Sequence, residues 1–220
     1  MKYRLPIAAA SVVLALFTSL AIGADEKGQA PSSKPDLAKA QQTVSEVCAA
    51  CHGPDGNSAS PANPSIAGQQ ADYLTLQLMH FQSVIRVNPV MQAMVAKLTP
   101  EDMRALGIFF AQQKPKPSAA KDPELVAAGQ KIFRGGNAAS GVPACAACHS
   151  PDGVGIPARY PRVGGQYADY TLAQLKAFKS GDRGADKEGK DVNGKVMAQI
   201  ASRMSEREMQ AAAEFASGLR

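Results

Sequence analysis

The sequence predicts an all-α protein built from two similar halves, and three observations lead to this prediction. The pentapeptide Cys-Ala-Ala-Cys-His occurs at residues 48–52 and again at 145–149, a spacing of 97 positions. Residues that follow the first copy recur after the second copy at the same spacing. Strand-like alternation is absent, whereas several segments carry apolar residues at helical spacing. A tandem duplication of one helical domain accounts for all three observations.

The N-terminal segment has the composition of an export signal. Two basic residues precede an uncharged apolar run at 7–23, which ends in small residues before an acidic pair. This order predicts a secretory signal peptide over residues 1–24, cut after Gly23 or Ala24. An uncleaved membrane anchor is the alternative, because the apolar run is at the short end of the length that spans a bilayer.

The first half is expected to begin after a flexible lead-in at residues 25–34, in which Pro and Ser are frequent. A helix starts at Pro35-Asp36-Leu37, with proline in the first turn and an acidic residue near the positive end of the helix dipole. It runs toward Cys48. A turn-forming Gly-Pro-Asp-Gly-Asn cluster follows His52.

Two further helices complete the first half. One is expected over residues 71–84, where Leu74, Leu78 and Phe81 have helical spacing. A loop then leads to Met91. The last helix runs from Met103 to about residue 112 and follows a capping-box-like start, Thr99-Pro100-Glu101-Asp102. The Pro-rich segment at 114–122 ends this helix and forms the linker between a first domain, 35–113, and a second domain, 123–220.

The second half repeats this order with two insertions. A helix begins at Pro123, and nine extra residues rich in Gly and Ala, 135–143, delay the second Cys pair. A second nine-residue insertion, near 184–192, shifts the repeat spacing to 106. At the two spacings, the residues that match the first half include Gln166 (Gln69), Tyr170 (Tyr73), Leu175 (Leu78), Phe178 (Phe81), Arg183 (Arg86), Met197 (Met91) and Phe215 (Phe109).

The two Cys-Ala-Ala-Cys-His motifs have the pattern of covalent haem c attachment sites. On a helix the two sulfurs and the imidazole project from one face, so two thioethers can hold the edge of a porphyrin while the histidine reaches its iron. The cofactor prediction is therefore two haem c groups, each with one iron. The covalent attachment sites are Cys48, Cys51, Cys145 and Cys148, and the axial histidines are His52 and His149.

Two other functions use motifs of this kind. A thioredoxin-like Cys-x-x-Cys pair would be expected once and in a βαβ context, which the sequence lacks. A zinc site would need a fourth ligand for each cluster, and only one further histidine, His80, is available for two sites.

The repeat also selects the second axial ligands. Met91 and Met197 match each other and are expected in loops, from which a thioether could reach the open face of the haem. Met94 is the nearest competitor, but its counterpart is Ile200. The remaining methionines are expected in helices as core or surface residues: Met79, Met103, Met204 and Met209. His80 corresponds to Ala177 and is expected to be an ordinary surface histidine.

Each half resembles a class I cytochrome c, with a helix, a Cys-x-x-Cys-His motif, a Pro-x-[Ile/Val]-x-Gly loop, a methionine segment and a closing helix. Two such halves resemble the cytochrome c4 family of dihaem electron carriers. The resemblance implies that the carbonyls of Pro64 and Pro161 accept hydrogen bonds from the axial histidines. It also implies two haems that face each other across the interface between the domains. One departure is that the first helix lacks a glycine matching Gly129.

The expected function is electron transfer, not catalysis, because an iron with both axial positions filled has no place for a substrate. The resemblance implies a periplasmic carrier between a quinol-oxidising cytochrome bc complex and a terminal oxidase. The alternatives are a haem subunit of, or electron acceptor for, a periplasmic dehydrogenase, and a dihaem enzyme such as a peroxidase. Peripheral membrane association is compatible with these functions. After residue 24 the first half is neutral and the second carries a net charge near +3, too weak and too mixed for nucleic-acid binding.

Overall fold

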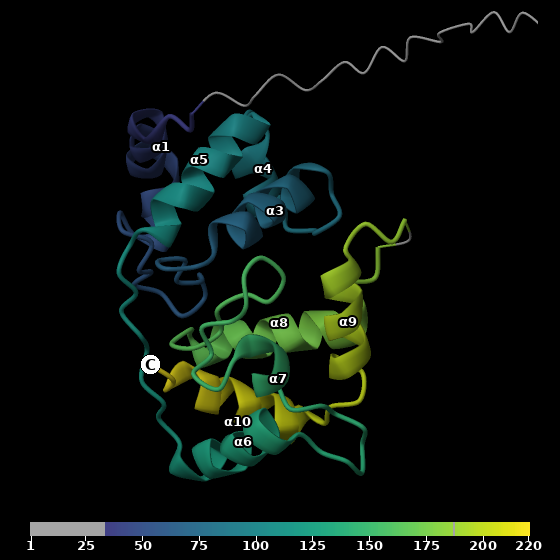
Figure 1. Cartoon of the computed structure of the whole chain (residues 1–220). Coiled ribbons are helices and arrows are strands. Elements are labelled where there is room, and N and C mark those ends of the chain that lie inside the picture. Colours follow the sequence, from purple (N-terminus) through teal and green to yellow (C-terminus); the bar gives the residue numbers. More distant parts are fainter. Residues whose placement is uncertain (1–33, 187) are drawn as a thin grey trace, which may run out of the picture. The chain divides into compact units, whose positions relative to one another are not determined.

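The computed structural model describes residues 34–186 and 188–220. The predicted signal peptide, 1–24, and all but the last residue of the predicted lead-in, 25–34, lie outside the described residues. The prediction of an all-α fold is confirmed (Figure 1). Within the described ranges, β-type pairing is limited to two isolated bridges, Asn137 with Val142 and Ile156 with Tyr160.

Six helical segments form the first half. They are α1 (Leu37–Thr43), the π-helical η1 (Val44–Cys48), α2 (Ala49–His52), α3 (Ala71–Gln82), α4 (Pro89–Val95) and α5 (Pro100–Ala111). The first three follow one another without a break, so the helix expected to run toward Cys48 continues through the whole first pentapeptide. Asp36 caps this helix by accepting the Lys39 N–H at 2.9 Å.

The second half is formed by α6 (Pro123–Gly135), α7 (Ala146–His149), α8 (Ala168–Ser180), α9 (Val192–Ala201) and α10 (Glu206–Ser217). A loop separates α6 from α7, as the insertion at 135–143 predicts. The capping box predicted at Thr99 is present, because Thr99 Oγ1 accepts from Asp102 N at 3.2 Å and Asp102 Oδ2 accepts from Thr99 N at 3.0 Å. Ser205 and Glu208 form the equivalent box before α10.

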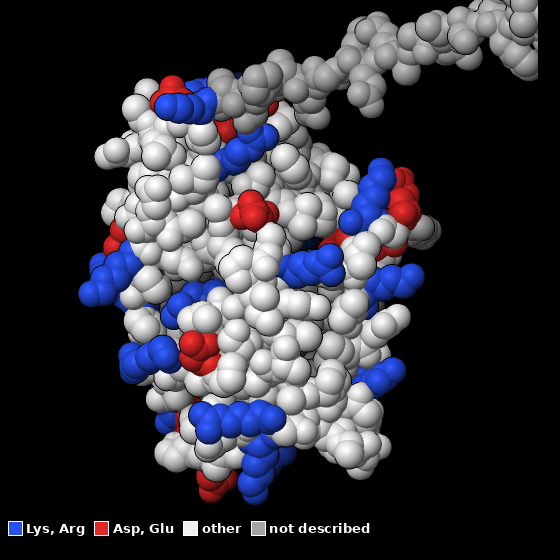
Figure 2. Space-filling model, viewed as in Figure 1, with Lys and Arg blue, Asp and Glu red and all other residues white. Residues whose placement is uncertain are grey.

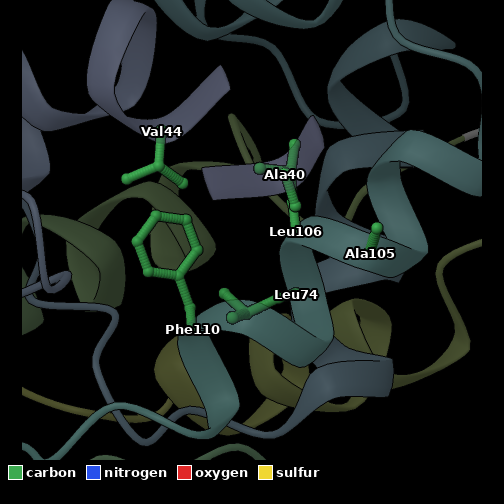
Figure 3. Packing of buried hydrophobic residues seen from close by; sticks show 6 residues of the cluster. All are labelled: Ala40, Val44, Leu74, Ala105, Leu106 and Phe110. Carbon is green, nitrogen blue, oxygen red and sulfur yellow. The ribbon is translucent and has the colours of Figure 1, made fainter. Parts of the chain in front are cut away.

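Each half has its own core around its last helix. In the first half α5 packs against α1 and α3. The buried side chains of this core are shown in Figure 3: Ala40, Val44, Leu74, Ala105, Leu106 and Phe110. In the second half α10 packs against α6 and α8, with Phe133 and Phe215 in one cluster beside Cys145. The cysteine of the second motif therefore lies next to the aromatic core.

The helix pair α6–α10 is close because of Gly129. A Cβ atom at this position would lie 2.0 Å from Ala211 O and 2.7 Å from Phe215 Cβ. The first half has no such glycine, as the sequence shows, and Ala40 packs against Ala105 and Leu106 of α5 there. The two halves therefore pack their first and last helices differently.

Side chains at equivalent positions of the repeat join the two halves. Arg86 Nη2 donates to Tyr170 Oη and to Gln174 Oε1, both at 2.9 Å. In the equivalent set from the other half, Arg183 Nη2 donates to Tyr73 Oη at 2.9 Å and to Gln77 Oε1 at 3.1 Å. Each guanidinium also lies over a phenylalanine ring of its own half, Phe81 at 4.6 Å and Phe178 at 4.5 Å. The repeat thus supplies a two-fold set of contacts that joins the halves.

Within the described residues, no helix combines the length and the apolar character needed to cross a bilayer.

Candidate functional site

Both pentapeptides are helical, as their proposed chemistry requires. Cys48 is the last residue of η1, and α2, which carries Cys51 and His52, follows without a break. His149 ends α7, and Cys145 immediately precedes that helix. The spacing of three and four residues on a helix places the two thiols and the imidazole on one face.

The first cysteine of each motif, Cys48 and Cys145, is half-buried and is not poised for redox exchange. Burial raises the pKa of Cys48 and of Cys145 to about 11. A thioredoxin-like nucleophile needs a lowered thiol pKa, so that it is a thiolate near neutral pH. These environments therefore do not support the thioredoxin alternative.

Each histidine is held by the proline that the resemblance implied. The Nδ1 atom of His52 lies 2.9 Å from Pro64 O, and that of His149 lies 2.9 Å from Pro161 O. Since a carbonyl oxygen can only accept, Nδ1 carries the proton and Nε2 keeps its lone pair. Burial lowers the pKa of both histidines, an effect that the proline carbonyls partly oppose. Both rings are therefore presented as neutral imidazoles, the form that binds a metal.

The two matched methionines do not lie in loops, and this part of the prediction is wrong. Met91 is in α4 and Met197 is in α9, and both side chains are half-buried. Asn88 caps α4 by accepting the Met91 N–H at 2.9 Å, and Pro89 occupies the first helical position. In the same helix Met94 is 45 % exposed. Both methionines are helical, so secondary structure does not favour either of them as the iron ligand, whereas the lower exposure of Met91 does.

The other methionines pack in the cores. Met103, Met204 and Met209 are almost fully buried, and Met79 is partly buried beside Met103. Met204 was expected in a helix, but it lies in the turn between α9 and α10. Its burial against Val142 and Ala212 explains why an apolar residue occupies that turn.

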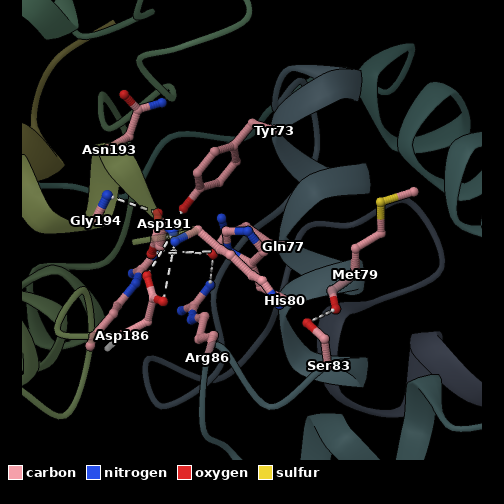
Figure 4. Close-up of polar contacts among 12 residues, drawn as sticks. Tyr73, Gln77, Met79, His80, Ser83, Arg86, Asp186, Asp191, Asn193 and Gly194 are labelled. Carbon is pink, nitrogen blue, oxygen red and sulfur yellow. Dashed lines mark hydrogen bonds and ion pairs between the residues drawn. The ribbon is translucent and has the colours of Figure 1, made fainter. Parts of the chain in front are cut away.

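The prediction for His80 is also wrong, because this histidine is buried, with 4 % of its surface exposed. Its Nδ1 atom has no hydrogen-bond partner among residues 34–186 and 188–220 and lies 3.9 Å from Asp191 Oδ2 (Figure 4). Asp191 belongs to the second insertion and is itself fixed by Gly194 N at 2.8 Å. The burial was missed because the residues that cover His80 come from the other half of the chain.

The residues that join the two halves carry no functional signal in the sequence other than their recurrence in the repeat. Among the described residues, the side chains of Arg86 and Arg183 donate hydrogen bonds to the neutral oxygens of tyrosine and glutamine side chains. The Nε atom of Arg183 has no partner among these residues. The sequence does contain a sign of these contacts, because Tyr, Gln and Arg recur at matched positions of the repeat. A buried guanidinium with a free N–H suits a carboxylate, and the propionates of haem c are carboxylates. The donor sets that occur in both halves, two cysteines and a proline-held neutral imidazole on one helical segment, fit two haem c groups.

Comparison with known proteins agrees with this fit. A family model described as cytochrome c matches residues 126–219, and one described as cytochrome c oxidase, cbb3-type, subunit III matches residues 35–109. Cytochrome c4 of Azotobacter vinelandii is 39 % identical over 192 residues, which cover 83 % of this chain and 89 % of that protein.

Two further comparisons extend the likeness. The thiosulfate dehydrogenase electron acceptor of Thiomonas intermedia is 35 % identical, with 76 % of each chain covered. The crystal structure of reduced recombinant cytochrome c4 from Pseudomonas stutzeri superposes with a TM-score of 0.77 at 34 % identity, covering 85 % of this chain and all of that chain. With this extent of identity over both halves, the chain belongs to the cytochrome c4 family, as a dihaem c-type electron carrier and not an enzyme.

Proposed function

We propose that this protein is a periplasmic carrier that takes electrons from a quinol-oxidising cytochrome bc complex and passes them to a terminal oxidase. The observation that carries the proposal is that both halves have the same Cys-x-x-Cys-His motif, a histidine held by a proline carbonyl and a matched methionine. A protein with one catalytic haem would need one set to differ, leaving an open iron position with acid–base groups beside it. The predicted signal peptide supports the location, since it directs export.

In each half we assign the thioethers to the two cysteines and the axial positions to a histidine and a methionine. The first set is Cys48, Cys51, His52 and Met91, and the second is Cys145, Cys148, His149 and Met197. Haem c supplies one-electron chemistry at its iron. The neutral imidazoles would bind the iron through Nε2, and the proline carbonyls fix the orientation of the rings. A methionine thioether on the iron would favour the reduced state and so raise the reduction potential.

Three substitutions test this ligand assignment. Met91→Ala and Met197→Ala should each make one haem high-spin, lower its potential and remove about half of the ferric methionine–iron absorption band. Met94→Ala is the matched control on the same helix and should leave the spectrum and both potentials unchanged, because its side chain is largely exposed. Loss of the band in Met94→Ala would contradict the assignment.

A second candidate for the electron donor, a dehydrogenase, has specific support. The named relative from Thiomonas intermedia accepts electrons from thiosulfate dehydrogenase. The oxidised protein should therefore be mixed with quinol-reduced membranes, with and without an inhibitor of the cytochrome bc complex, and separately with periplasmic extract and thiosulfate. Inhibitor-sensitive reduction by membranes supports the bc complex, and reduction by thiosulfate extract alone identifies a dehydrogenase as the donor.

Surface charge does not point to a single partner. On the face drawn in Figure 2, basic and acidic side chains are scattered and do not gather into one large patch.

Mass spectrometry of the exported protein tests the location, with an N-terminus at Ala24 or Asp25 expected. A retained leader would show that the protein is anchored.

A further inference from the structure

The hydrogen bond that holds each histidine continues into the other half of the chain. The Pro64 carbonyl that accepts from His52 belongs to the same peptide group as the Ser65 N–H. This N–H donates to Gln166 Oε1 at 3.1 Å, and Gln166 Nε2 donates back to Ser65 O at 2.7 Å. A glutamine of the second half therefore holds the backbone beside the histidine of the first half.

The same arrangement occurs in the opposite direction. The Pro161 carbonyl accepts from His149, and the Arg162 N–H of that peptide group donates to Gln69 Oε1 at 2.9 Å. Gln69 Nε2 donates to Arg162 O, also at 2.9 Å. The contacts are reciprocal, so each half holds the histidine support of the other.

The orientation of both amides is determined by their partners. Each Oε1 accepts a second backbone N–H, from Tyr167 for Gln166 and from Gln70 for Gln69, both at 3.0 Å. Because backbone N–H groups only donate, Oε1 must face them and Nε2 must face the carbonyl. Neither side chain can turn over without losing three hydrogen bonds.

A hydrogen bond at one end of a peptide group strengthens the bond at its other end. The C–N bond has partial double-bond character, so donation from the N–H shifts electron density toward the carbonyl oxygen. Cooperative strengthening of this kind is about 10–30 % per bond. A stronger carbonyl acceptor draws the Nδ1 proton of the histidine and makes the ring a better donor to its metal.

We propose that Gln166 and Gln69 are positioning residues that adjust the reduction potential of the haem in the opposite half. The inference rests on the proposed ligation by His52 and His149. A better-donating imidazole stabilises Fe(III), so each glutamine lowers the potential of the haem across the interface. Removing it should raise that potential and leave the haem of its own half unchanged.

The test is a redox titration of the purified dihaem protein with one glutamine replaced. Gln166→Met keeps the length of the side chain but removes its hydrogen bonds, and should raise the first-half potential. The expected change is roughly two- to threefold in the Fe(II)/Fe(III) ratio at a fixed applied potential. For one electron this equals about 18 to 28 mV. Gln69→Met should produce the same change in the second-half haem only.

Each wave is assigned in a Met91→His or Met197→His background, where the altered haem moves to a much lower potential. If neither background displaces a wave, the proposed axial ligation fails. If both displace one wave but the glutamine variants shift neither haem, shift the haem of their own half, or shift both equally, the inference fails while the ligation stands. Gln166→Asn, which is too short to reach Ser65, provides a second variant should Gln166→Met not fold.

Tyr167→Phe is the matched control. It removes another bond between the halves, from Tyr167 Oη to Ser58 O at 2.6 Å, on the residue next to Gln166. This bond does not involve the Pro64–Ser65 peptide, so both potentials should stay in place. A shift of the first-half potential as large as that in Gln166→Met would show a general effect of interface loss and overturn the proposal.

Discussion

Replacing Gly129 by alanine should destabilise the second half and disturb its haem. The added Cβ would lie 2.0 Å from Ala211 O, whereas ordinary contact is 3.4–4 Å. Relief requires α6 and α10 to separate by more than about 1 Å. A gap of 0.5–1 Å forfeits roughly a quarter to a half of the dispersion attraction between the atoms concerned.

The magnitude follows from two opposing effects. Overpacking a well-packed core costs about 1–3 kcal/mol, and the upper end applies because the obstructing atom belongs to the backbone. Alanine is the better helix former by about 0.5–1 kcal/mol. The free energy of unfolding should therefore fall by about 2 kcal/mol, which lowers Tm by about 4–8 °C for a chain of this size.

The assay is thermal unfolding of the dihaem protein followed by far-UV circular dichroism, together with a redox titration. Gly135→Ala is the control on the same helix, since a Cβ there meets nothing within 4 Å. It should leave Tm equal or higher. Because Phe215 packs beside Cys145, Gly129→Ala should also shift the second-half potential and not the first. An unchanged or raised Tm in Gly129→Ala would refute the reasoning.

Three further predictions concern the buried interface and the helix ends. Arg183→Leu leaves the Tyr73 hydroxyl and two glutamine amides short of a donor, and should cost about 3 kcal/mol in urea unfolding; a cost like that of the exposed control Lys176→Ala would contradict this. Burial, more than Arg183 and Arg86, lowers the pKa of His80, while Asp191 and Asp186 raise it. The unfolded chain then binds more protons than the folded protein, so stability should decrease as pH falls below 6.5. His80→Gln should flatten this dependence in urea unfolding at pH 7.5 and 5. An equally steep decrease in the variant would exclude His80 as the source. Thr99→Ala should cost about 1 kcal/mol by removing the N-cap, and an unchanged unfolding midpoint would show that Pro100 suffices.

The local features of the fold were predictable from the sequence. The pentapeptides, the capping boxes and the turn clusters depend on residues within a few positions of one another, so their signals are complete in a short window. The helix at Met91 could also have been predicted, because Asn88 followed by Pro89 is a typical helix start. This helix, Pro89–Val95, has seven residues, which is too few for the periodicity of its apolar residues to be recognised.

Contacts between the halves could not be predicted in the same way. The burial of His80 depends on Asp191, which is more than one hundred positions away and lies in an insertion with no counterpart in the first half. The bonds from Gln69 and Gln166 likewise end on backbone atoms 93 and 101 positions away, respectively. The repeat identified these glutamines as matched, but a single sequence does not reveal which backbone groups they contact.

The contacts of Gln69 and Gln166 have a consequence for how the two halves could diverge. Each glutamine binds only main-chain atoms of its target residue, and these atoms are the same whatever side chain is attached. The two target positions are accordingly occupied by very different residues, Ser65 in one half and Arg162 in the other, yet both make the same pair of bonds. A duplicated gene could therefore alter the surface of either half at these positions while retaining the glutamines that reach across.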